Sequence, residues 1–87
     1  MIEIKPETIK LSKAIELNGV KVNTLTMRAP TVGDELDARQ LAGGDDAKFE
    51  LHILASLLGG APDDLRQVLK RDYGKLTKAY LRLSSEE

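Results

Sequence analysis

The Asn18-Gly19 pair constrains the fold more than any other feature, because it is the strongest short-range signal for a β-hairpin. Both residues tolerate the positive φ angles of a type I′ turn, and apolar and polar residues alternate on either side of the pair. A two-residue turn aligns Leu17 with Val20, so apolar side chains face one another on one side of the ribbon. We therefore predict an antiparallel hairpin over residues 8–29.

The alternation slips by one residue in the second half of this hairpin. After the turn the first apolar residues have even numbers, but Leu25 and Met27 have odd numbers. A single β-bulge near Asn23-Thr24 would return the apolar side chains to the buried face. With that bulge, Met27 is expected opposite Leu11.

Residues 25–36, LTMRAPTVGDEL, change from an alternating apolar run to an acidic segment. Pro30 cannot donate to a strand ladder, and Thr31 and Asp34 have the spacing of a helix capping box. A phosphate-binding loop would need a lysine and further glycines in this segment, which has neither. The segment is therefore interpreted as the junction between a strand and a helix over residues 31–42.

Further helices are predicted from capping residues and apolar spacing. Residues 47–53, AKFELHI, alternate as a strand would, but an Asp pair precedes this apolar segment and Gly59-Gly60 follows it. We therefore assign a helix to residues 45–58. The remaining two helices are expected at residues 62–70 and 72–83. The predicted fold is a single α+β domain over residues 1–87, with a small N-terminal antiparallel sheet followed by three to four helices.

The helix at residues 45–58 has more apolar surface than one core-facing side needs. One apolar strip consists of Leu51, Leu54 and Leu58, and we assign it to the core. The other consists of Phe49, Ile53 and Leu57, and we assign it to a partner-binding face, either for self-association into a homo-oligomer or for a helix of another protein. The alternative is that neighbouring short helices cover both strips.

Composition argues against catalytic, metal and cofactor sites in this 87-residue chain, which has no cysteine. The only histidine, His52, shares a polar helix stripe with Lys48 and Ser56 and has no second ligand at helical spacing. Three of the four acidic pairs, Asp34-Glu35, Asp45-Asp46 and Asp63-Asp64, fall at predicted helix starts, where the helix dipole accounts for them. No apolar run approaches the length of a membrane span, so we expect a soluble cytoplasmic protein.

The basic segment KRDYGKLTKAYLR carries both tyrosines, a combination that could suggest nucleic-acid binding. Tyr73 and Tyr80 belong to the apolar side of the predicted helix, however, and its cations lie on the other side. The net charge of −1 also gives no bulk attraction to a polyanion. We therefore interpret the segment as a solvated helix face, with a small nucleic-acid-binding regulator as the weaker alternative.

The order of these elements resembles the phage tail assembly chaperone family of Mu-like phages and prophages. The resemblance is carried by NGVKVNTLTMRAPTVGDEL, by the glycine-bounded apolar helix and by LGGAPDDLRQVLKRDYGKL, and it covers nearly the whole chain. It includes T-x-R-x-P-T-x-G-D at residues 26–34. One departure is Ala61, because a Ser or Thr before Pro62 would cap the next helix.

The resemblance implies a non-enzymatic assembly factor rather than an enzyme. Such a protein would bind the tape measure protein, keep it soluble and promote assembly of the tail-tube protein around it. It would act in the cytoplasm of the bacterial host and would be absent from the mature virion. The alternative is a structural tail or head–tail joining subunit, which stoichiometric presence in purified tails would indicate.

Overall fold

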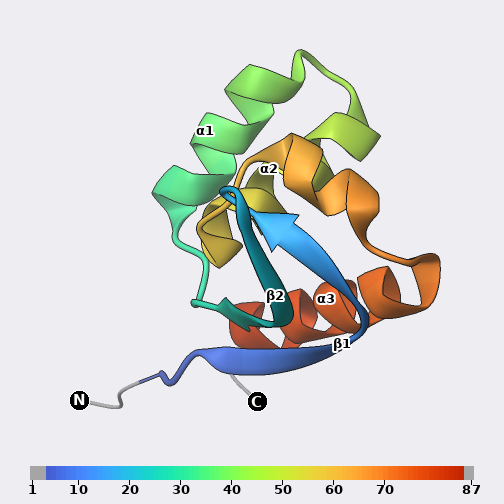
Figure 1. Cartoon of the computed structure of the whole chain (residues 1–87). Helices are drawn as coiled ribbons and strands as arrows, with labels where there is room; N and C mark the ends of the chain where they lie inside the picture. The colour runs from blue at the N-terminus through green and yellow to red at the C-terminus, as the bar shows by residue number, and fades with distance from the viewer. Residues whose placement is uncertain (1–3, 86–87) are drawn as a thin grey trace.

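The computed structural model describes residues 4–85, which form a two-stranded antiparallel sheet followed by four helical segments. The elements in chain order are β1 (Glu7–Leu17), β2 (Val20–Met27), α1 (Val32–Ala42), α2 (Asp46–Leu58), the 3-10 helix η1 (Pro62–Gln67) and α3 (Lys70–Ser84). Figure 1 shows α3 alongside the lower part of β1, with α1 at the top of the molecule. This architecture confirms the predicted α+β fold class.

The hairpin turn has the geometry that its sequence predicts. Asn18 and Gly19 have φ angles of 53° and 81°, as a type I′ turn requires. Leu17 pairs with Val20, and the register continues with Glu16 opposite Lys21. Opposite charges therefore meet on one face of the ribbon, and the predicted register beside the turn is confirmed.

Replacing Gly19 with valine is expected to lower the free energy of unfolding by on the order of 1 kcal/mol or more. The cause is backbone strain alone, because a Cβ at this position would meet no atom within 4 Å. Urea denaturation of the two proteins measures the difference. Gly19→Asn is the control and should retain most of the stability, since asparagine tolerates positive φ. Equal losses in the two variants would contradict the assignment of strain to the β-branched side chain.

The predicted single bulge in β2 is wrong. Lys10 pairs with Thr24 and Ile15 with Val22, so residues 11–14 stand opposite one residue of β2. The irregularity therefore belongs to β1, and Met27 pairs with Glu7 instead of Leu11. The physical reason lies outside the hairpin, because backbone groups in the irregular part of β1 bond to α3.

α3 covers the edge of β1 with polar side chains. The Asp72 carboxylate accepts hydrogen bonds from the Ser12 backbone N–H at 2.8 Å and from the Ser12 hydroxyl at 2.9 Å. The Lys75 ammonium donates to the Lys10 carbonyl at 3.0 Å and lies 3.2 Å from Asp72. Asp72 is fully buried, and although burial opposes ionisation, hydrogen bonds from Ser12 and Lys75 hold its pKa below the ordinary value.

The helix boundaries follow the predicted capping residues. The Thr31 hydroxyl accepts from the Asp34 backbone N–H, and the Asp34 carboxylate accepts from the Thr31 N–H, which completes a capping box. Asp45 caps α2 by accepting from the Lys48 N–H at 3.1 Å. Gly59 ends α2 in the left-handed conformation. The junction interpretation of residues 25–36 is thus confirmed.

The segment after α2 differs from its prediction. It forms a six-residue 3-10 helix in place of the helix expected at residues 62–70, and α3 begins at Lys70 rather than at residue 72. Ala61 supplies no side-chain cap. Asp64 accepts from the Asn18 backbone N–H at 3.2 Å, and the Gln67 side chain exchanges two 3.0 Å hydrogen bonds with the Glu16 backbone. Tertiary contacts with the hairpin therefore hold this short helix.

The hydrophobic core lies where α2 meets the hairpin, η1 and α3. Its largest fully buried apolar side chains come from three different elements, namely Leu25, Met27, Ile53, Leu54 and Leu76. Leu58 also belongs to this core, whereas Leu51 is only partly buried beside it. The core assignment is thus correct for two residues of the first strip of α2, and Leu51 lies at its margin.

Candidate functional site: an apolar groove beside α1

Helix α1 is attached to the domain through small side chains and leaves its large apolar ones in solvent. Within α1 only Ala38 and Ala42 are buried, and they allow α1 to pack closely on α2. Val32 is 75% exposed and Leu36, one turn later, is 64% exposed. These two side chains share one side of the helix because they are four residues apart. The outer side of α1 is therefore an apolar surface that no described residue covers.

The start of α1 is held in place despite this shallow burial. The Arg28 guanidinium binds the Asp34 carboxylate through two hydrogen bonds of 2.7 and 2.9 Å. This bidentate pair and the Thr31 N–H hold the pKa of Asp34 well below its usual range. Polar contacts at the strand–helix junction thus orient the exposed apolar side of α1.

The last turn of α1 is held against α2 by Arg39. Its guanidinium lies 3.8 Å from the centroid of the Phe49 ring and forms a 3.0 Å ion pair with Asp46. A cation over an aromatic face is attracted by the ring's negative π surface. Arg39 therefore links α1 to α2 and keeps Phe49 partly covered.

Two hollows border Tyr80 of α3. The larger lies between the start of α1 and the end of α3, and the smaller lies between α2 and α3, beside Arg39 in the last turn of α1. The larger has a volume of about 830 Å³, and its apolar lining comes from Ile4, Ala29, Pro30, Val32, Tyr80 and Leu83. The smaller has a volume of about 380 Å³, and its apolar lining comes from Phe49, Ile53, Leu54, Tyr80 and Leu81. We call the two hollows together the α1–α3 groove.

The predicted partner-binding strip is only partly at this groove. Phe49 and Ile53 line the smaller hollow, but Ile53 and Leu57 are 1% and 2% exposed and belong to the core. The prediction of an exposed strip is therefore wrong for Ile53 and Leu57, because α2 is central and its neighbours cover both strips. A partner contact at the half-buried Phe49 stays a prediction.

The apolar residues that are accessible at the groove were missed by the sequence patterns. Val32 lies in a segment interpreted only as a helix start, and Leu81 lies between the predicted apolar and basic sides of the last helix. Leu81 is 65% exposed. The available signal was the four-residue spacing of Val32 and Leu36, which places both on one side of the helix. Large apolar residues on a helix side that faces solvent contribute nothing to the core, so such a pair indicates a contact with another protein.

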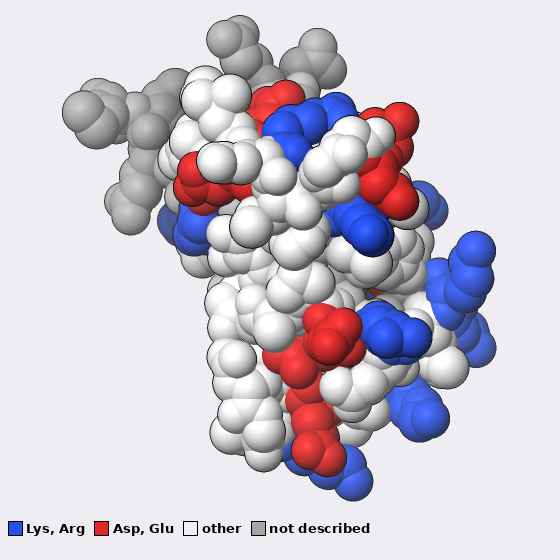
Figure 2. Space-filling model, turned by 90° about the horizontal axis from the view of Figure 1, so that it is seen from above, with Lys and Arg blue, Asp and Glu red and all other residues white. Residues whose placement is uncertain are grey.

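Figure 2 views the molecule from the side that carries α1 in Figure 1. Uncharged residues cover much of the middle and left of this face, and acidic and basic side chains lie in separate groups around them. This surface is suited to apolar contact with a charged margin, which is the usual anatomy of a protein-binding site.

The described residues show no arrangement typical of metal binding. Within residues 4–85 no group of three or more His, Asp or Glu side chains could hold a metal ion. His52 is half-buried in a separate hollow with Leu41 and Pro62, on another side of α2. In the same part of the chain, no helix is both long and apolar enough to cross a membrane.

Comparison with protein families assigns the chain to a known family. The family model described as "Phage tail assembly chaperone proteins, E, or 41 or 14" matches residues 8–84, which include the hairpin and all the helices. Searches against curated proteins and against solved structures gave no match. Since the matching region spans nearly the whole chain, this protein belongs to the phage tail assembly chaperone family.

Proposed function

We propose that this protein is a non-enzymatic chaperone that binds an amphipathic helical segment of the tape measure protein in the α1–α3 groove. In this role it would keep the tape measure protein soluble in the host cytoplasm until the tail-tube protein assembles around it. The complex would then release the chaperone, which would not enter the mature virion. Family membership supports the tail assembly role, and the groove is the surface best suited to hold a helix.

The observation that carries the proposal is the accessible apolar surface in each of the two hollows of the groove, at Val32 in the larger and at Leu81 in the smaller. Val32 lies on the α1 side and Leu81 on the α3 side, and each exposes about two thirds or more of its surface. Covering a large aliphatic side chain contributes on the order of 1.5–3 kcal/mol, which rewards a partner that fills the groove. Recognition of a helix by its apolar face in such a groove is a recurrent mode of peptide binding.

The double substitution Val32→Ser with Leu81→Ser is expected to abolish co-purification of a co-expressed tape measure protein. Both side chains face solvent, so the variant should keep the far-ultraviolet circular dichroism and most of the stability of the wild type. The binding loss follows because one apolar contact is removed from each of the two hollows that make up the groove. Affinity purification from cells expressing both proteins provides the measurement.

The matched control is Val20→Ser with Leu41→Ser. These residues are similarly exposed but lie at the hairpin turn and beside the separate His52 hollow. This control should bind the tape measure protein as the wild type does. Retained binding by the groove variant, or equal loss in the control, would contradict the α1–α3 groove as the binding site.

A further inference from the structure

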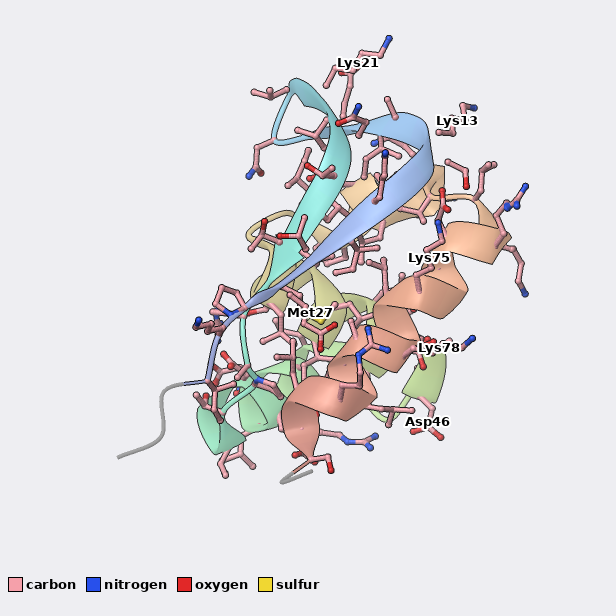
Figure 3. The ribbon with its side chains drawn as sticks, turned by 90° about the horizontal axis from the view of Figure 1, so that it is seen from below. Lys13, Lys21, Met27, Asp46, Lys75 and Lys78 are labelled. Carbon is pink, nitrogen blue, oxygen red and sulfur yellow. The ribbon has the colours of Figure 1, made fainter. Side chains whose placement is uncertain are left out.

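A second surface, formed by β1 and α3, carries a concentration of positive charge. Its six exposed basic residues are Lys10, Lys13, Arg71, Lys75, Lys78 and Arg82, and we call it the β1–α3 basic face. Figure 3 shows Lys13 on β1 and Lys75 and Lys78 on the neighbouring α3, with Lys78 on the side of the helix farther from the strand. The four residues from α3 have the spacing i, i+4, i+7 and i+11, so they form one stripe.

Hydrogen bonds join this stripe to the strand. Lys75 donates to the Lys10 carbonyl at 3.0 Å, and Arg82 forms an ion pair with Glu7 of 2.6 Å. The two contacts are about two helical turns apart along α3, so they fix the helix and strand side by side. Basic residues of the two elements are thus brought to neighbouring positions in the fold, although they are about 60 positions apart in the sequence.

The charge on this face is far from balanced. The chain has 13 basic and 14 acidic residues, but 6 of the basic residues lie here. The two carboxylates in contact with them are Asp72, which is buried against Lys75, and Glu7, which pairs with Arg82. Six cations less two paired anions leave four unmatched positive charges. Within residues 4–85 no ion pair involves Lys13, Arg71 or Lys78.

This separation of charge has an energetic cost in the free protein. Arg71 and Lys75, and likewise Lys78 and Arg82, are like charges four residues apart on one helix, a spacing at which they repel. The carboxylates that could have offset them are at the starts of the other helices, as in Asp34, Asp45 and Asp64. A partner that supplies negative charge would relieve this repulsion.

We propose that the β1–α3 basic face docks an acidic protein segment, separately from the segment held in the groove. A protein partner is favoured over nucleic acid because no aromatic side chain lies among these cations for a base to stack on. Tyr73 and Tyr80 are half-buried on another side of α3. The chain's net charge of −1 also opposes a long polyanion while allowing a local acidic surface.

The test uses a short poly-glutamate peptide as the acidic probe. Arg82 also borders the larger hollow of the groove, so it is left out of the comparison. Titration into the full chain should shift the amide NMR signals of Lys13, Arg71 and Lys78 and leave those of the groove residues Val32 and Phe49 unchanged. The triple variant Lys13→Glu, Arg71→Glu, Lys78→Glu should bind the labelled peptide at least about tenfold more weakly by fluorescence anisotropy. These three side chains have no described partner, so the variant should fold.

The matched control is Lys5→Glu, Lys48→Glu, Arg66→Glu, which changes the net charge equally at exposed residues other than the six of this face. It should bind at least several-fold more tightly than the first variant. Equal losses would overturn the proposal, because net charge alone would then explain binding. Tighter binding of a DNA duplex than of poly-glutamate at physiological salt would also overturn it. If the first variant unfolds, Lys13→Gln with Lys78→Gln should still weaken binding.

Discussion

Replacing Ile53 with serine is expected to lower the free energy of unfolding by roughly 4–6 kcal/mol. Ile53 is 1% exposed at the centre of the core, so the change removes most of an aliphatic side chain and buries a hydroxyl. A domain of this length has a total stability of about 4–13 kcal/mol, so a large fraction of the variant should be unfolded at physiological temperature. Circular dichroism with urea denaturation measures the loss.

Phe49→Ser is the informative comparison for this variant. Phe49 neighbours Ile53 on the same strip of α2, but it is half-buried and partly covered by the Arg39 guanidinium. Its substitution should cost about 1–3 kcal/mol and leave the protein folded. An unfolding free energy of Ile53→Ser close to that of the wild type would show that this strip is not part of the core.

Removing the Asp72 carboxylate is expected to lower the melting temperature by roughly 5–15 °C. Asp72→Ala leaves the Ser12 backbone N–H without its acceptor in the irregular part of β1. It also leaves the Lys75 ammonium without its carboxylate, which adds one unmatched charge to the β1–α3 basic face. Differential scanning calorimetry of Asp72→Ala and of Ser12→Ala, which loses only the hydroxyl contact, measures the effect. Ser12→Ala should cost less, and equal losses would contradict the role of the Ser12 N–H.

The same carboxylate makes stability depend on pH in a defined direction. The pKa of Asp72 is lower in the folded state than its ordinary value, so the unfolded chain takes up the proton at a higher pH. The contribution is complete above a pH of about 4–5 and is lost as the pH falls through the folded pKa. Asp34 and Glu7 have lowered pKa values and act in the same direction. Asp72→Asn should therefore lose less stability than the wild type between neutral and acidic pH.

Local sequence determined the hairpin and the ends of the helices. Asn18-Gly19 specified the turn because few residue pairs adopt two successive positive φ angles. Thr31 and Asp34 specified the start of α1 because their side chains bond to backbone groups three residues away. Such features depend on atoms that are neighbours in the chain, so they were predictable without knowledge of the fold. The order of these features also supported the resemblance to the family that matches residues 8–84.

Only the tertiary structure decided which apolar and polar side chains became buried. Periodicity identified two apolar strips on α2 but not their coverage, and packing buried Ile53 and Leu57 because α2 has neighbours on several sides. The irregularity in β1 and the burial of Asp72 depend on each other across 60 positions of sequence. The α1–α3 groove likewise exists because α1 packs through alanines and turns Val32 outward. Contacts between distant segments are selected by the free energy of the whole packed domain, and no local pattern contains that information.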